Sequence, residues 1–199
     1  MDQESEEHKY AFIHIPKNAG MSISKAIKHI PIIKSYGHGV FFENVAHLNK
    51  LFVVREPIDR FTSSFFYVKK HYITDLFRDP EELICSILSN DGKSNNFLKF
   101  QKNPHRVNGS EIPTDWVFHP QSAWVHDPFR ILLFDNLDNE ISKLGNELNA
   151  DIILPKVNVS DRIDFKYSDE SINFLKMRYK DDFELYKSVM IGRGVYYTY

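Results

Sequence analysis

The segment at residues 10–23 constrains the fold of this chain more than any other. Its sequence is YAFIHIPKNAGMSI, in which an apolar run predicts a buried strand over about residues 10–15. A tight loop then carries Lys17 and Gly20, and a helix is expected to begin near Ser22. Such a turn gathers backbone N–H groups around an anion and places the positive end of a helix dipole behind it. Because the lysine adds a full charge, the segment predicts a site for a phosphate or sulfate ester.

The order of lysine and glycine separates this loop from a Walker A motif. That motif requires Gly-x-x-x-x-Gly-Lys-Ser/Thr, whereas here Lys17 precedes Gly20. A small-molecule or nucleotide kinase is the nearest alternative, since it shares the strand–loop–helix anion site. It would also need an acidic magnesium ligand at the end of a strand, and the sequence places none convincingly.

Apolar runs alternate with helical patterns along the rest of the chain. Strands are predicted over residues 32–35, 50–55 and 129–134, and helices over about 21–29, 57–70, 80–89, 137–148 and 168–187. This alternation predicts an α/β fold of three layers, in which helices flank a mostly parallel sheet. Residues 90–116 are polar and rich in turn signals, which predicts a long irregular insertion.

Length and composition limit the class of protein. At 199 residues the chain is expected to form one domain over residues 10–199, preceded by a flexible acidic tail over residues 1–9. The formal net charge of −2 argues against binding nucleic acid through a broad basic field. No apolar run approaches the ~18–20 residues that span a bilayer, and the acidic start is unlike a signal peptide, so a cytoplasmic location is expected.

Cys85 is the single cysteine, which excludes an internal disulfide and a multi-cysteine zinc site. It lies within the apolar run Leu83–Leu88. We therefore expect a buried structural thiol in preference to a nucleophile.

Two further clusters fall at predicted strand ends or on adjoining loops, where ligands of parallel sheets bind. Arg55 closes a strand and Ser63 lies about two turns into the next helix, so the pair could bind a second phosphate. A helix-capping arginine with solvated serines is the alternative interpretation. His38 stands between Gly37 and Gly39, which opens it to close approach by a ligand, and an ordinary imidazole pKa near 6.5 suits a general base. An ordinary surface turn is the alternative there.

Taken in order, these segments resemble the P-loop-like sulfotransferases that use 3′-phosphoadenosine 5′-phosphosulfate (PAPS). The chain is most similar to the carbohydrate branch that contains the uronyl 2-O-sulfotransferases and their bacterial relatives. Residues 14–22 match the 5′-phosphosulfate loop, residues 37–42 the catalytic-histidine segment and residues 53–64 the 3′-phosphate motif. Later family segments match at residues 119–121, 132–137, 155–160 and 179–183. The resemblance therefore covers nearly the whole chain.

The resemblance implies transfer of a sulfuryl group from PAPS to a hydroxyl of an acceptor, expected to be a carbohydrate or glycoconjugate, without a metal. His38 would act as general base and Lys17 would neutralise charge on the leaving group. The positions implied to bind PAPS are Lys17, Asn18, Ala19, Gly20, Met21 and Ser22 in the loop, Arg55 and Ser63 at the 3′-phosphate, and Asn158 and Ser160 beside the adenosine. His119 and Gln121 are implied as substrate contacts.

The chain departs from the family pattern in the phosphosulfate loop. Many members carry threonine and glycine where this chain has Asn18 and Ala19, and threonine or serine where it has Met21. Backbone amide contacts survive these changes, but a hydroxyl contact at Met21 does not. A non-catalytic module that binds the bisphosphate or a glycan is the alternative from a different class, and retention of both Lys17 and His38 argues against it.

The acceptor and the oligomeric state are left open by the sequence. Candidate basic residues for a polyanionic acceptor are scattered: Lys69, Lys70, His71, Lys99, Lys102, His105 and Arg106. Such residues more often form a solvated face than a polymer track. A neutral glycan, a lipid-linked sugar or a small hydroxylated metabolite therefore fits at least as well.

Overall fold

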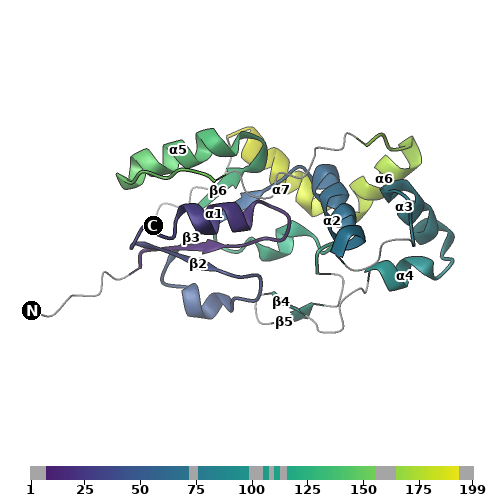
Figure 1. Cartoon of the computed structure of the whole chain (residues 1–199), viewed down its shortest axis with the longest axis horizontal. Coiled ribbons are helices and arrows are strands. Elements are labelled where there is room, and N and C mark those ends of the chain that lie inside the picture. The colour runs from purple at the N-terminus through teal and green to yellow at the C-terminus, as the bar shows by residue number, and fades with distance from the viewer. Residues whose placement is uncertain are drawn as a thin grey trace, which may run out of the picture.

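A parallel sheet forms the centre of the protein, with strands in the order β2–β1–β3–β6 (Figure 1). The computed structural model describes residues 8–71, 76–98, 105–107, 110–112, 116–155 and 165–192. The four strands are β1 (Tyr10–Ile13), β2 (Ile33–Tyr36), β3 (Asn49–Val54) and β6 (Arg130–Leu133). All neighbouring pairs are parallel, as the alternation of strands and helices predicts.

The side chains of the strands alternate between two hydrophobic clusters. Ala11, Ile13 and Phe52 point into one cluster, which also holds Trp116 and Trp124. The opposite cluster takes the residues between them, Phe12, Leu51 and Val53, together with Leu132. This period of two is that of a pleated strand, and burial on both faces explains the continuous apolar run of β3.

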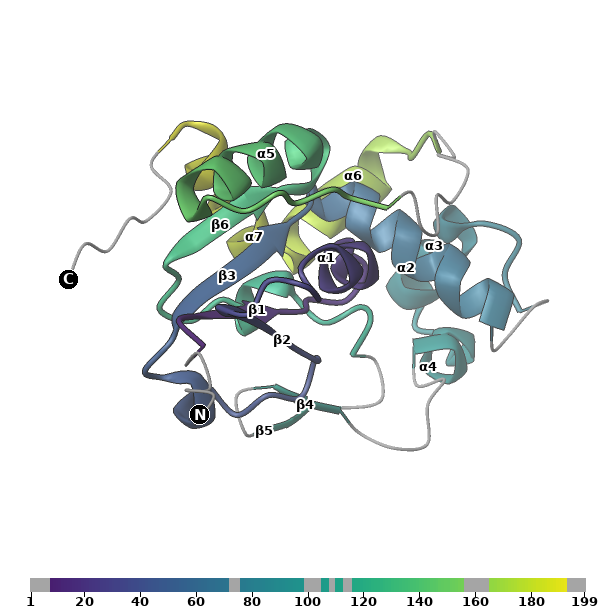
Figure 2. The ribbon, with the colours of Figure 1, turned by 60° about the vertical axis from the view of Figure 1, so that its left-hand side comes forward.

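Helices cover both faces of the sheet, which agrees with a three-layer α/β fold (Figures 1 and 2). Helices α1 (Gly20–Ala26) and α5 (Leu137–Leu148) pack on the face of Phe12 and Val53. The opposite face is covered by the 3₁₀ turns η1 (Phe42–Val45) and η2 (Gln121–Trp124). Helix α7 (Lys180–Met190) contacts both β6 and η2.

A second group of helices lies beyond the carboxyl ends of the strands. Helices α2 (Pro57–His71), α3 (Pro80–Ser89), α4 (Lys93–Leu98) and α6 (Asp169–Arg178) surround a third hydrophobic cluster rich in phenylalanine. They gather on one side of the sheet in both ribbon views (Figures 1 and 2). The helices predicted at 57–70, 80–89 and 137–148 are confirmed within about one residue.

The single helix predicted over residues 168–187 is wrong, because the chain bends at Tyr179 and forms α6 and α7. Tyr179 has φ −111° and ψ 29°, outside helical values. Its buried hydroxyl donates to the carbonyl of Phe118 at 2.8 Å, a tertiary contact that the helical periodicity does not reveal.

The wholly irregular insertion predicted over residues 90–116 is also wrong. This region contains α4, which buries Phe97, and an antiparallel pair formed by β4 (His105–Val107) and β5 (Ser110–Ile112). The dipeptide Asn108-Gly109 between the two strands is a hairpin signal that could have identified them.

Cys85 is exposed on α3, contrary to the expected buried thiol. Residual desolvation and the nearby carboxylates of Glu81 and Glu170 raise the pKa of its thiol. A raised pKa disfavours the thiolate, which is the reactive form of a cysteine.

Among the residues described, none of the helices combines the length and apolar character that crossing a bilayer requires. The prediction of an acidic tail over residues 1–9 concerns mainly residues 1–7, which lie outside the described residues.

Candidate functional site

The loop between β1 and α1 holds two non-glycine residues in a left-handed backbone conformation. Lys17 has φ 67° and Ala19 has φ 58°. L-residues rarely adopt such angles, and each costs of the order of 1 kcal/mol or more unless the surrounding structure holds it. Left-handed residues in a tight loop turn successive N–H groups toward a common point, as in the nests that bind anions. The strain therefore lies at the predicted phosphosulfate loop.

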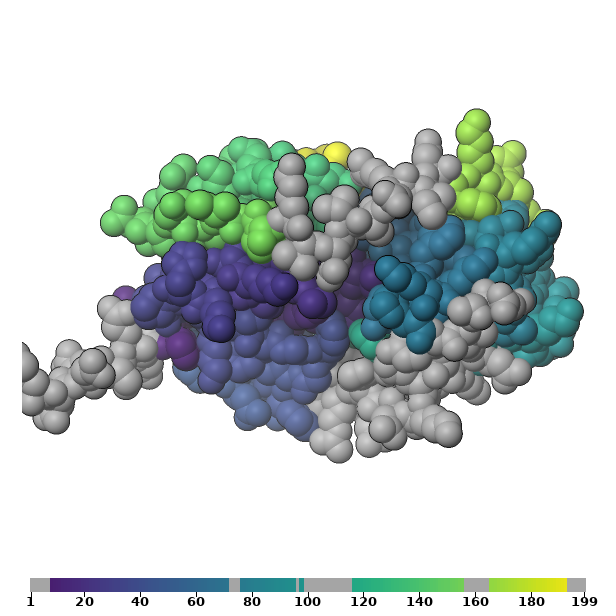
Figure 3. Space-filling model, viewed as in Figure 1, coloured from purple at the N-terminus to yellow at the C-terminus, as the bar shows by residue number. Residues whose placement is uncertain are grey.

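Arg55, which follows β3, and Arg60 of α2 hold this loop through its backbone carbonyls. Arg55 Nη1 donates to the carbonyl of Lys17 at 3.0 Å, and Arg60 Nε donates to the carbonyl of Pro16 at 3.1 Å. In return, Asn18 Nδ2 donates to the carbonyl of Val53 at 2.7 Å. These hydrogen bonds thus bring residues 53–60 and the loop after β1, which are far apart in the sequence, into one place. The space-filling view shows the surfaces of the β1–α1 segment and of α2 meeting on this face (Figure 3).

His38 lies close to the same loop, and a hydrogen bond defines its tautomer. Its Nδ1 is 2.7 Å from the carbonyl oxygen of His14. Because a carbonyl only accepts, Nδ1 carries the hydrogen and Nε2 is the basic nitrogen of the neutral ring. The ring also packs against His14 and Trp116, with centroid distances of 4.1 and 4.9 Å. Trp124 Nε1 donates to the carbonyl of His38 at 3.3 Å, so both ring and backbone are held.

Gly20 and His14 connect this histidine to the start of α1. A Cβ atom placed on Gly20 would lie 1.6 Å from Cδ2 of the His14 ring. The imidazole of His14 therefore occupies the space that the glycine leaves, while its other side faces His38. A Cβ on Gly37, by contrast, would meet nothing within 4 Å, which agrees with the open approach predicted beside His38.

One face of α2 contacts both Arg55, which precedes the helix, and Lys17 of the loop. Asp59, Ser63 and Tyr67 are spaced by four residues and share that face. Asp59 Oδ2 accepts from Arg55 Nε at 2.7 Å, and the ring of Tyr67 lies 4.3 Å from Lys17 Nζ. Ser63, midway between these two contacts, is half-buried on the same face. The structure therefore joins Arg55 to the loop of Lys17 and places Ser63 on the same face of α2 as Tyr67.

Positive charge accumulates around Lys17. Burial first, and then the guanidinium groups of Arg55 and Arg60, lower the pKa of Lys17 to about 8. Burial, His38 and Lys17 lower the pKa of His14 to about 3, so this imidazole is neutral near pH 7. Within the part of the chain that the structure describes, no carboxylate lies within ion-pair distance of Lys17. An anion on the loop would relieve this repulsion.

The Arg55 side of the site carries less net charge. Asp59 pairs with Arg55, and burial raises the pKa of Glu56, with Asp59 and Asp135 adding to the effect. The guanidinium also lies over the ring of Phe134 at 4.2 Å. Lys17 is therefore the stronger attraction for an anion, and Arg55 is the more tightly held group.

Arg60 supports the site through backbone carbonyls, and no local sequence pattern distinguishes it. It is fully buried and donates to three carbonyls, those of Pro16, Val117 and His119, at 3.1, 3.3 and 2.9 Å. Burial lowers the pKa of its guanidinium, and the charge of Asp182 acts in the opposite direction. The arginine thereby ties the loop after β1 to residues 117–119.

Gln121, implied by the resemblance as a substrate contact, is buried, and its amide is used within the protein. Its Oε1 accepts from Asn18 Nδ2 at 2.8 Å and from the backbone N–H of Arg55 at 3.0 Å. Its Nε2 donates to the carbonyl of Arg55 at 2.7 Å. This geometry does not support a substrate contact and assigns Gln121 to positioning the loop and the end of β3.

Asp182 completes this network from α7. Its carboxylate accepts from the backbone N–H groups of Gln121 and Ser122 at 2.9 and 2.8 Å, and the side chain is fully buried. No local sequence signal marks Asp182, because its two backbone partners lie 61 and 60 residues away in the chain.

The remaining predicted residues occupy different environments. Met21 is exposed and Ser22 half-buried in the first turn of α1, whereas Asn18 is buried with its Oδ1 unpaired. The ring of His119 meets the ring of Trp124 edge-on at 5.5 Å. The predicted residues Asn158 and Ser160 lie outside the described residues.

Two other features could indicate a function: metal-binding groups among the described residues, and similarity to known proteins. Among the described residues, no group of three or more His, Cys, Asp or Glu side chains is arranged to hold a metal ion. Comparisons of the chain with protein-family models, with curated proteins and with solved structures found no match.

Proposed function

We propose that the protein is a sulfotransferase that moves the sulfuryl group of PAPS to a hydroxyl of an acceptor, with a carbohydrate as the favoured acceptor class. One observation carries the proposal. The strained loop of Lys17 lies beside His38, whose Nδ1 is bound by the carbonyl of His14 at the end of β1. Sulfuryl transfer requires a site that binds the anionic donor and a base held in a fixed orientation, and these two parts lie side by side here.

The residues of the loop fit a donor with phosphate groups at both ends. Lys17, with a pKa lowered first by burial and then by Arg55 and Arg60, would regain its full charge beside the 5′-phosphosulfate. Arg55 and Ser63, at the adjoining end of α2, are proposed to bind the 3′-phosphate. Asn158 and Ser160 are proposed, from the resemblance alone, to contact the adenosine.

The chemistry assigned to the protein's own residues is proton transfer and charge neutralisation. When bound, PAPS supplies an activated sulfuryl group. Nε2 of His38 would take the proton of the acceptor hydroxyl as its oxygen forms a bond to sulfur. The bond from sulfur to the 5′-phosphate oxygen breaks, and Lys17 would balance the charge left on that oxygen. Positioning and electrostatics supply most of the catalysis in group transfers of this kind.

A thermal-shift panel separates this proposal from its alternatives. Adenosine 3′,5′-bisphosphate without metal, at 100 times its Kd, should stabilise the protein by about 2.7 kcal/mol, or roughly 5–11 °C in Tm. The Lys17→Ala variant should lose most of this shift. Stabilisation by ATP with Mg²⁺ and none by the bisphosphate would instead support a kinase.

Transfer of label from [³⁵S]PAPS to a panel of acceptors is the second measurement. The panel would contain neutral oligosaccharides, lipid-linked sugars, small polyols and a sulfated polysaccharide. Bisphosphate binding with no transfer to any of these acceptors would favour a non-catalytic binding module.

A further inference from the structure

The half-buried Lys17 lies against an aromatic ring. Its Nζ lies 4.3 Å from the centroid of the Tyr67 ring. The charged groups that act on it from the elements packed around it are Arg55 and Arg60, while His14 on the preceding strand is neutral. The carboxylate of Asp59 is engaged by Arg55. The ring of Tyr67 is therefore the attractive partner of this ammonium group among the described side chains.

A ring and a carboxylate have different consequences for an anion site. A carboxylate would hold the ammonium group but would cancel its charge and repel an incoming phosphate. The quadrupole of an aromatic ring attracts a cation while adding no net charge. Lys17 can thus be held in place and still present its whole charge to a ligand.

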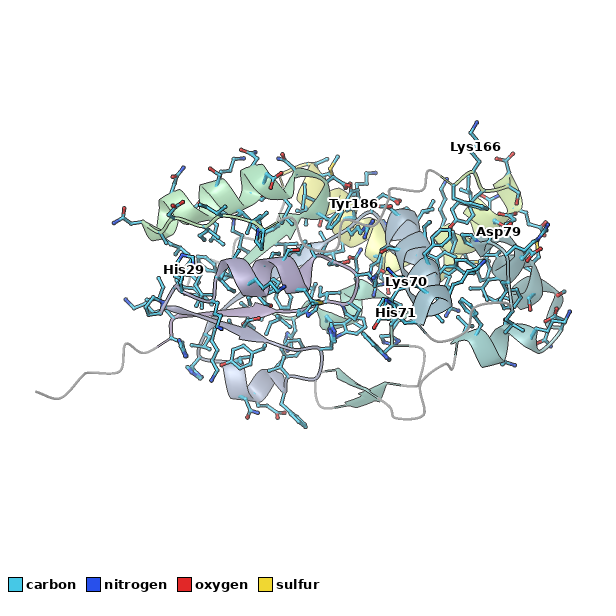
Figure 4. All side chains as sticks on the ribbon, in the orientation of Figure 1. His29, Lys70, His71, Asp79, Lys166 and Tyr186 are labelled. Carbon is cyan, nitrogen blue, oxygen red and sulfur yellow. The ribbon has the colours of Figure 1, made fainter. Side chains whose placement is uncertain are left out.

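The ring itself is fixed by its surroundings. Tyr67 is half-buried on α2 and packs against both the cluster of Trp116 and the cluster of Phe65. The ring of His71, one turn further along α2, lies 4.8 Å away. Figure 4 shows His71 and Lys70 beside each other at the end of this helix. The Tyr67 ring that Lys17 contacts is therefore held in place by the packing of α2 against its neighbours.

We propose that Tyr67 is a positioning residue for Lys17: its ring holds the strained lysine with the ammonium group available to the anionic donor. The assignment of the anion to PAPS rests on the proposed function, whereas the contact between ring and ammonium does not. The hydroxyl of Tyr67 has no part in the proposal, so phenylalanine should replace tyrosine without loss.

Two variants and a matched control test the contact directly in the full chain. Tyr67→Phe keeps the ring, Tyr67→Leu keeps apolar volume without it, and Tyr10→Leu removes a half-buried tyrosine at the opposite end of β1. Competitive acetylation over a pH series, quantified by mass spectrometry of the peptide containing Lys17, measures the pKa of that lysine without any ligand. Thermal unfolding of each variant checks folding, and Tyr67→Met replaces Tyr67→Leu if the latter fails to fold.

The expected result is a lower Lys17 pKa in Tyr67→Leu, by between about 0.4 and 1.5, because a cation–π contact contributes ~0.5–2 kcal/mol to the charged form. Tyr67→Phe and Tyr10→Leu should keep the wild-type value. An unchanged or higher Lys17 pKa in Tyr67→Leu would overturn the proposal, as would a Phe variant that behaves like the Leu variant.

Calorimetric titration with adenosine 3′,5′-bisphosphate at pH 7 measures the consequence for binding. Tyr67→Leu should bind between about twofold and thirtyfold more weakly than wild type, and Tyr67→Phe within twofold. Equal affinity of the Leu variant and wild type would contradict the positioning role. Absence of binding by wild type would contradict the proposed function alone, since the acetylation experiment still decides the role of Tyr67.

Discussion

Replacing Gly20 by alanine should have two opposing effects on stability: a gain in helix propensity and a steric clash with the ring of His14. Gly20 is the first residue of α1, and its φ is not in the left-handed region, so alanine by itself should stabilise the helix by about 0.5–1 kcal/mol. The new Cβ, however, would lie 1.6 Å from Cδ2 and 1.9 Å from Nε2 of His14. Ordinary contact needs about 3.5–4 Å, so the His14 ring would have to move by roughly 2 Å.

The ring of His14 has little room for that movement, because the ring of His38 lies 4.1 Å from it. Overpacking of this kind typically costs about 1–3 kcal/mol. After the gain in helix propensity, Gly20→Ala should reduce the free energy of unfolding by about 1–2 kcal/mol, or the Tm by roughly 2–8 °C. Chemical denaturation followed by circular dichroism measures this difference.

A double-mutant cycle identifies the cause. In a His14→Ala background the clash is gone, so Gly20→Ala should become neutral or stabilising. Gly37→Ala is the matched control, since its Cβ would meet nothing within 4 Å, and it should change stability little. If Gly20→Ala raised the Tm in the wild-type background, the reasoning from the His14 contact would be refuted.

Three further outcomes are expected. His38→Ala should lower turnover by about 10²–10⁴-fold and leave the Kd for adenosine 3′,5′-bisphosphate nearly unchanged; a collapse of affinity would argue against its role as base. The affinity of wild type for the same bisphosphate should fall as the pH rises through about 8, the pKa of Lys17, because the neutral amine no longer attracts the anion. Lys17→Arg should bind without that decline, and a parallel decline in both proteins would exclude Lys17 as its source. Arg60→Met removes the donor to the carbonyls of Pro16 and His119, whereas the carbonyl of Val117 keeps the hydroxyl of Ser64, so the free energy of unfolding should fall by about 2–5 kcal/mol in urea titrations; a loss below about 1 kcal/mol would contradict its structural role.

Local signals made the strands and most helices predictable. Strand β3 lies between β1 and β6 and is buried on both faces, so its apolar run is continuous. Helix α3 begins at Pro80 behind Asp79, whose side chain accepts from the backbone N–H of Glu82. In such elements the residues that determine the structure are also close together in the sequence.

The errors have tertiary causes. Helical periodicity continues through Tyr179, and only a hydrogen bond to Phe118, 61 residues away, reveals the bend. Cys85 lies in an apolar run, but α3 is amphipathic and turns its neighbours Leu83 and Ile84 inward.

In the candidate site, too, some residues could be predicted from the local sequence and others only from the fold. Lys17, His38 and Arg55 were identified by residue type at the ends of predicted elements. The roles of Arg60 and Gln121 depend on partners from other parts of the chain, and so does the burial of Asp182. Positioning residues of this kind are not recognisable without the fold.

The carboxylate of Asp182, bound to the N–H groups of residues 121 and 122, also has a consequence for the order of events during synthesis. Asp182 follows Gln121 by 61 residues, and the predicted phosphosulfate loop, His38 and Arg55 all precede Gln121, so a growing chain has made them long before this carboxylate leaves the ribosome. Until then the backbone N–H groups of Gln121 and Ser122 lack their carboxylate acceptor. Gln121, which accepts from Asn18 of the loop, is therefore not yet fixed in position. A nascent chain should therefore lack a fully supported loop until α7 has emerged, so that the last helix of the described residues sets the moment at which the candidate site is complete.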